Sequence, residues 1–134
     1  MRPLLIVSAI LEGMVGAALI LIPATTITVL LGAPPHTPVG LAVTRGCGVA
    51  LLSLGAAYWL ARNETQSAVA RGLVIAMLLY NGAFILILGH ARIGLELNGI
   101  GLWPGIVLHV ALVIWCVICL RREPRFASPA ATKR

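Results

Sequence analysis

The chain has 134 residues, of which 60% are hydrophobic and only 10% are charged, and its mean hydropathy is +1.01. A soluble globular domain carries about a quarter charged residues, so this composition excludes an ordinary soluble domain and indicates an integral membrane protein. The net charge of +6 would suit nucleic acid, but the basic residues are scattered between apolar runs and gather only near the C-terminus. A membrane surface explains them better, so we expect a lipid bilayer as partner and no nucleic acid.

Four apolar segments of membrane-spanning length follow one another along the chain, at 4–22, 39–61, 68–89 and 103–120. About 20 apolar residues cross the hydrocarbon layer as a helix, and lipid leaves a single isolated span no other way to satisfy its backbone. We therefore predict an all-α fold, an up-and-down bundle of four transmembrane helices within one domain, 1–122. A basic, flexible C-terminal tail, 123–134, is predicted to follow it.

The connections between these segments are rich in proline and glycine. Pro23 either ends the first span or begins a short helical continuation, and the later run "APPHTP" cannot stay helical because prolines remove donors and clash with the preceding turn. For the segment His90–Leu102, which contains charges and three glycines, two interpretations stay open. It either folds back as a cap over the bundle or forms an interfacial loop held by Trp103.

Basic residues are distributed unequally between the two sides of the predicted bundle. The side that would hold both termini and the loop between the second and third spans carries Arg2, Arg62, Arg71, Arg121, Arg122, Arg125, Lys133 and Arg134. The other side carries only Arg45 and Arg92. The positive-inside rule then places both termini in the cytoplasm, and we expect a protein of the bacterial inner membrane.

The first span contains a carboxylate, Glu12, near its middle. Intramembrane carboxylates are costly and usually face a helix interface or an internal cavity, which makes a functional role the default hypothesis. Next to the stripe that holds Glu12 runs a stripe of small residues at every fourth position, which lets another helix backbone approach closely. The predicted helix-packing positions are Ala9, Gly13, Ala17, Gly48 and Gly55.

Further polar side chains lie inside the other spans. At about 1.5 Å of rise per residue, Arg45 lies within reach of Glu12, either directly or through water; the alternatives are that Arg45 snorkels outward or pairs with Glu96 in the loop. We expect one polar pocket for a ligand, with no catalytic residue assigned. Its candidate residues are Glu12, Arg45, Tyr80, Asn81, His109 and Glu96. For the tyrosine, asparagine and histidine, ordinary interhelical hydrogen bonding is the alternative.

Metal and redox chemistry find little support. The three histidines, His36, His90 and His109, lack the short fixed spacing of a zinc site, so no metal is predicted. The run "CVIC" at Cys116–Cys119 looks like the dithiol of membrane oxidoreductases related to vitamin K epoxide reductase. Here, however, it lies among apolar neighbours on the predicted cytoplasmic side, so we interpret these cysteines as small apolar packing groups.

The pattern as a whole resembles a known family. The runs "LEGMVGAALILIP", "TRGCGVALLSLGAAYWLA", "YNGAFILILG" and "WPGIVLHVALVIW" are similar to segments of the small four-helix DoxX-like proteins, over nearly the whole length from Leu4 to Leu120. The resemblance implies a compact up-and-down bundle with both termini inside. The wider family includes members associated with quinol oxidation and redox sulfur metabolism, but it implies no single activity.

Three functions remain open. The first is a binding or accessory membrane protein whose polar pocket holds a lipid-like ligand such as a quinone or isoprenoid; no other cofactor is predicted. The second is a structural subunit that packs against a larger membrane complex, as a membrane-protein partner or a homo-oligomer. The third is an enzyme or proton-coupled transporter that uses Glu12 as its titrating group. Whether the protein is an enzyme stays open.

Overall fold

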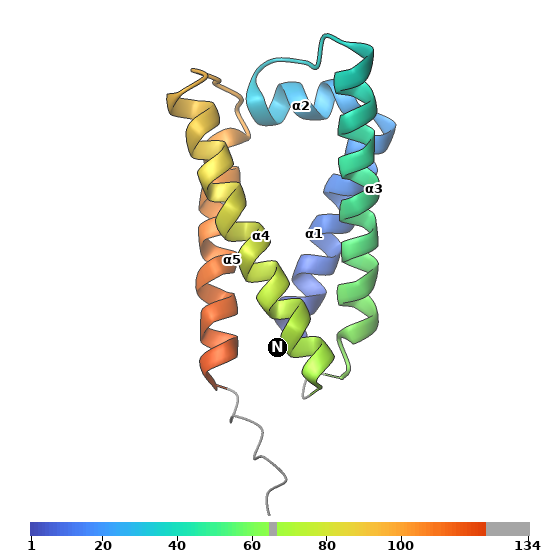
Figure 1. Ribbon diagram of the computed structural model, residues 1–134, viewed down its shortest axis with the longest axis vertical. Helices are drawn as coiled ribbons and strands as arrows, with labels where there is room; N and C mark the ends of the chain where they lie inside the picture. Colours follow the sequence, from blue (N-terminus) through green and yellow to red (C-terminus); the bar gives the residue numbers. More distant parts are fainter. Residues whose placement is uncertain (65–66, 123–134) are drawn as a thin grey trace, which may run out of the picture.

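The computed structural model describes residues 1–64 and 67–122, and within these ranges all regular structure is helical. The helices are α1 (Arg2–Leu21), α2 (Pro23–Leu31), α3 (Pro38–Ala61), α4 (Ala68–Ile93) and α5 (Leu102–Arg122). All except α2 are long and apolar enough to cross a membrane. Together they form an up-and-down bundle, while the nine-residue α2 lies across one end of it (Figure 1).

Local sequence signals set the helix ends. Thr37 and Ser67 cap α3 and α4, because their side chains accept hydrogen bonds from the backbone N–H groups of Gly40 and Ala70. Pro23 supplies no N–H, so α1 stops before it and α2 begins at it. Gly32 ends α2 with a φ of 90°, in the left-handed region that glycine reaches without a Cβ penalty.

Helices α1 and α3 form the tightest pair in the bundle. A Cβ atom added at Gly16 of α1 would lie 2.7 Å from the carbonyl oxygen of Gly48 in α3, and a Cβ added at Gly48 would lie 2.7 Å from the carbonyl oxygen of Gly16. One heptad along α3, a Cβ at Gly55 would lie 3.0 Å from the carbonyl oxygen of Ala9. Backbone therefore touches backbone along this seam, which is the packing that small residues permit inside membranes.

The second pair is α4 with α5, and it meets α1 and α3 mainly at the end that holds the N-terminus (Figure 1). The hydrophobic core gathers there, with contributions from all four long helices. Its members are Leu4, Leu5, Ala9, Tyr58, Val74, Met77, Leu112, Cys116 and Cys119. Toward the opposite end, which we call the α2 end, the two pairs diverge and α2 crosses between them (Figure 1).

The loop 94–101 packs against α2 at the α2 end. The backbone N–H of Gly101 donates to the carbonyl of Val29 at 2.9 Å, and Gly99 is so close to Leu30 that a Cβ at this position would overlap the Leu30 backbone. Of the two interpretations for the segment after the third span, this contact favours the cap. The loop 94–101 and α2 therefore lie against each other at the α2 end.

The predicted all-α bundle of four long helices is confirmed. Each span begins and ends within a few residues of its predicted bounds; the largest difference is in α4, which continues to Ile93 because nothing before Gly94 breaks its helical pattern. Pro23 begins a separate helix, as one of the two alternatives had it. The predicted tail 123–134 lies outside the described residues, and the cytoplasmic placement of the termini stays a prediction.

Candidate functional site

A buried polar pair joins α4 to α5 halfway along α4. Asn81 is completely buried, and its side-chain Nδ2 donates to the carbonyl of Met77 at 2.8 Å, one turn earlier on the same helix. Its Oδ1 lies 2.6 Å from Nδ1 of His109 on α5. Both polar atoms of the amide are therefore satisfied, and the pair ties the two helices together within the apolar layer.

This bond fixes the protonation pattern of the histidine ring. An amide oxygen only accepts, so Nδ1 of His109 must carry the proton and donate to Asn81. In a neutral imidazole the other nitrogen, Nε2, is then an acceptor. Within residues 1–64 and 67–122, Nε2 makes no hydrogen bond to the protein. The contact between α4 and α5 thus offers a hydrogen-bond acceptor to a hydroxyl or N–H group from outside the chain.

Two aromatic rings of α4 surround the same histidine. The ring centroid of Phe84 lies 5.1 Å from that of His109, with the planes tilted by 31°, and the ring of Tyr80 meets His109 edge-on at 6.0 Å. Tyr80 and Phe84 themselves lie 4.8 Å apart. Such offset and edge contacts are favourable between π systems. We call Tyr80, Asn81, Phe84 and His109 the α4–α5 aromatic seam.

Glu12 lies on α1, turned toward α3. Glu12 is only 7% exposed, and a Cβ built at Gly55 would be 3.5 Å from the Glu12 Cβ, so the Glu12 side chain leaves α1 beside Gly55 of α3. One turn earlier, the Ser8 hydroxyl donates to the Met77 sulfur at 3.2 Å, which links α1 to α4. The stripe that carries Ser8, Glu12 and Gly16 is therefore the buried face of α1.

Arg45 does not reach Glu12. The Arg45 side chain is exposed, and its Nε donates to the carbonyl of Ile20 at 3.3 Å. Ile20 stands in the last turn of α1, where carbonyl groups have no donor within the helix, so the arginine caps this helix end. Glu12 lies eight residues earlier, about 12 Å along the axis. A direct ion pair between Glu12 and Arg45, one of the alternatives open from the sequence, is not formed in this arrangement.

The predicted pocket residues divide into separate places. Tyr80, Asn81 and His109 come together in the α4–α5 aromatic seam. Glu12 faces the α1–α3 contact, Arg45 caps α1, and Glu96 lies in the exposed loop at the α2 end. Among the predicted packing positions, Gly48 and Gly55 lie in the α1–α3 seam, Ala9 offers its carbonyl to it, and a Cβ at Gly13 would meet open space. Ala17 is half-buried on α1.

One buried polar side chain, that of Tyr58, was not among the site residues predicted from the sequence. Tyr58 of α3 is completely buried, and its hydroxyl has no hydrogen-bond partner in the described part of the chain. An unpartnered buried hydroxyl costs free energy, and such groups often mark the place of a water or ligand. Periodicity could have found this tyrosine, because the buried residues of α3 recur at alternating spacings of four and three, namely Thr44, Gly48, Leu51, Gly55 and Tyr58.

The cysteines and histidines form no metal centre among the residues that the structure describes, where no group of three potential ligands is close enough to hold an ion. Cys116 and Cys119 are free thiols buried in the core, and Cys47 is an exposed free thiol on α3. Burial among apolar residues is the setting in which a cysteine acts as a packing group.

Besides Tyr58, four further residues were not assigned to a site from the sequence, namely Phe84, Gly16, Arg92 and Trp103.

The fold and these contacts define a class, a small α-helical integral membrane protein. Large apolar side chains stand exposed along all four long helices, including Leu21, Leu60, Leu79 and Val107, which is the surface that lipid requires. No family model, curated protein or solved structure matches the chain.

Proposed function

We propose that this protein is a DoxX-like membrane protein with a binding or accessory role, and that it holds a lipid-like ligand whose polar head carries a hydroxyl. A quinone in its reduced form and an isoprenoid alcohol both fit this description. The observation that carries the proposal is the hydrogen bond between Asn81 and His109, which leaves Nε2 of His109 as an acceptor within the membrane layer.

The surroundings of that acceptor support a ligand with a ring or an unsaturated chain. Phe84 and Tyr80 present aromatic faces and edges beside the imidazole, and planar groups pack favourably in such settings. Asn81 would act as a positioning residue, because it holds the tautomer and orientation of His109.

The unsatisfied Tyr58 hydroxyl gives independent support for an additional polar group inside the bundle. A buried hydroxyl is rarely left without a partner in native proteins. A water or a second polar atom of a ligand would supply that partner.

The alternative role, as a structural subunit, would use the exposed apolar faces of the helices to bind another protein. Every membrane helix presents such faces to lipid, so their presence does not favour a protein partner.

The experiment is native mass spectrometry of the protein in mild detergent, first as purified and then titrated with a short-chain ubiquinol and with farnesol. The variant His109→Phe keeps an aromatic ring and removes the acceptor. Ile114→Phe, on an exposed position of the same helix, is the matched control. We expect the wild type and Ile114→Phe to bind one of the probes with the same affinity, and His109→Phe to bind it about tenfold more weakly, as losing one buried hydrogen bond implies.

Two results would reject this function. Binding that is equal in the wild type and His109→Phe would remove the histidine from the site. A wild-type protein that retains neither probe and purifies instead in a stable assembly with another membrane protein would support the structural-subunit alternative. Helical circular dichroism of each variant shows that a loss of binding is not a loss of fold.

A further inference from the structure

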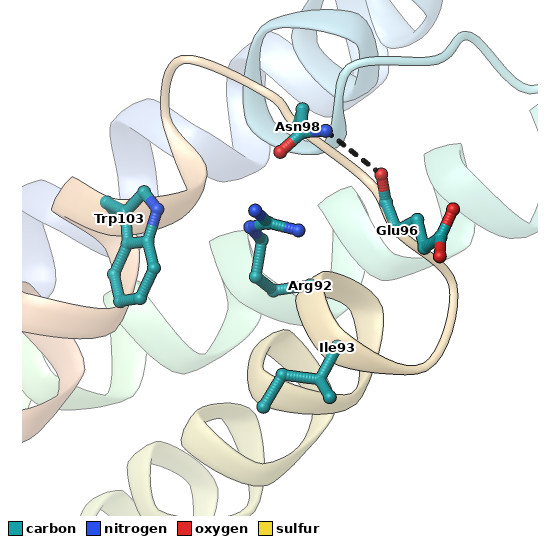
Figure 2. A pocket seen from close by; sticks show the side chains of 5 residues that line it. All are labelled: Arg92, Ile93, Glu96, Asn98 and Trp103. Carbon is teal, nitrogen blue, oxygen red and sulfur yellow. Dashed lines mark hydrogen bonds between the residues drawn. The ribbon is translucent and has the colours of Figure 1, made fainter.

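A second polar site lies at the α2 end, away from the α4–α5 aromatic seam. It is a surface depression of about 490 Å³ between the last turn of α4, the loop 94–101 and the first turn of α5. Its lining residues are Arg92, Ile93, Glu96, Asn98 and Trp103 (Figure 2). None of them belongs to the proposed ligand site, so the two proposals stand or fall separately.

Arg92 provides the charge of this depression. Its guanidinium group stands in the middle of the view, between the Trp103 indole and Asn98, while the Glu96 carboxylate points away from it (Figure 2). The Asn98 side-chain nitrogen donates to the backbone carbonyl of Glu96 at 3.2 Å, which holds the loop in place beside the arginine. In the described part of the chain no carboxylate forms an ion pair with Arg92, so its positive charge is left for an anion.

The apolar side chains at the edge of the depression indicate what kind of molecule would carry that anion. Ile93 is 83% exposed and Trp103 is 61% exposed, and they stand at the ends of two membrane-spanning helices, where tryptophan typically lies at the boundary between hydrocarbon and headgroups. A molecule that occupies the depression therefore meets a guanidinium group beside exposed apolar side chains. Guanidinium groups bind phosphate through two parallel hydrogen bonds.

We propose that Arg92 and Trp103 hold the phosphate of a phospholipid headgroup at the α2 end, with the acyl chains running down past Ile93. The guanidinium group of Arg92 binds two phosphate oxygens, and the Trp103 indole N–H donates to a third or covers the glycerol backbone. Glu96 leaves the phosphate unopposed because its carboxylate points elsewhere. The shared chemistry with free phosphate makes inorganic phosphate the necessary comparison.

The test is a native mass spectrometry titration of the detergent-solubilised full chain with three probes: a phosphatidylglycerol, a monoglucosyl diacylglycerol with the same acyl chains, and inorganic phosphate. The variant is Arg92→Gln. The matched control is Arg122→Gln, which removes one exposed arginine at the opposite end of the bundle. A second variant, Trp103→Phe, keeps the ring and removes the N–H donor.

We expect the wild type and Arg122→Gln to bind one phosphatidylglycerol more tightly than the glucosyl lipid. Arg92→Gln should lower the phosphatidylglycerol affinity at least about fivefold and leave the glucosyl lipid unchanged, as losing charge-assisted hydrogen bonds to phosphate implies. Trp103→Phe should give a smaller loss.

Equal affinity of the wild type for both lipids would overturn the proposal, and so would equal losses in Arg92→Gln and Arg122→Gln. Inorganic phosphate that displaces the lipid at comparable concentration would assign the depression to a free anion instead. Trp103 is exposed and Arg92 is half-buried, and neither belongs to the hydrophobic core. Their variants therefore keep the core intact, and thermal unfolding of each variant verifies this.

Discussion

The contact between Gly16 and Gly48 gives the most direct test of the packing. Gly16→Ala adds a single methyl group at the place where α1 and α3 touch, and that methyl carbon would lie 2.7 Å from the Gly48 carbonyl oxygen and 2.9 Å from the Leu52 backbone nitrogen. Both obstacles are backbone atoms of a helix, so neither can rotate away. The helices must move apart.

The distance by which α1 and α3 must move apart determines how much stability is lost. An ordinary contact begins at 3.4 Å, so the two helices must separate by roughly 0.7 Å at this point. A gap of 0.5–1 Å forfeits about a quarter to a half of the dispersion energy of each affected atom pair, and overpacking a close contact typically costs about 1–3 kcal/mol. We expect the free energy of unfolding to fall by about that amount.

Gly13→Ala supplies the matched control, because it makes the same chemical change on the same helix and its Cβ would meet no atom within 4 Å. The gain in intrinsic helix propensity from glycine to alanine, up to about 1 kcal/mol, is common to both variants and cancels in the comparison. The assay is reversible unfolding in mixed micelles, titrated with sodium dodecyl sulfate and followed by circular dichroism. If both variants unfold at the same detergent fraction, the described approach of α1 to α3 is wrong.

Three other experiments test single interactions by the same unfolding assay. A double-mutant cycle with Asn81→Leu and His109→Phe should give a coupling energy of about 0.6–1.7 kcal/mol, from the average to the largest value found by such cycles for interhelical hydrogen bonds in a membrane protein. Additive effects would mean that the bond is absent. Tyr58→Phe in ligand-free protein should leave the free energy of unfolding unchanged or raise it by about 1 kcal/mol, because the removed hydroxyl has no partner; a clear loss of stability would reveal a partner. Arg45→Met should lower that free energy by about 1 kcal/mol by removing the donor to the Ile20 carbonyl, and its effect should add to that of Glu12→Gln because the two side chains do not touch. Non-additivity would restore the Glu12–Arg45 pair.

The spans could be predicted from the sequence because their signal is local. A run of about 20 apolar residues specifies a membrane helix without reference to any other part of the chain. Turn and cap signals are equally local. Pro23 separates α1 from α2, and Gly32 separates α2 from the loop that follows it. The predicted grouping of Tyr80, Asn81 and His109 rested on their being polar residues inside the spans, and the position of a residue within a span follows from residue counting.

The rest depends on which helix lies next to which face, and that information is not local. Two stripes of small and polar residues run side by side on α1. Only the position of α3 decides that a side chain at Gly16 would meet α3 backbone, while one at Gly13 would meet open space. Arg45 has a long side chain with several possible acceptors, and the free carbonyl at the break before Pro23 was not among those considered. Tyr58 was not among the predicted site residues, although the alternating spacing of the buried residues on α3 leads to it.

The reciprocal approach of Gly16 and Gly48 also bears on the evolution of the chain. Each glycine is confined by the main chain of the other helix, so enlarging one position cannot be compensated by shrinking the other, which is already as small as an amino acid can be. Descendants of the same ancestor that preserve this seam would have to retain both glycines while the lipid-facing leucines, valines and isoleucines drift freely among themselves. The spacing of the two glycines is therefore a better marker of common ancestry than overall apolar similarity, which unrelated membrane helices share by chance.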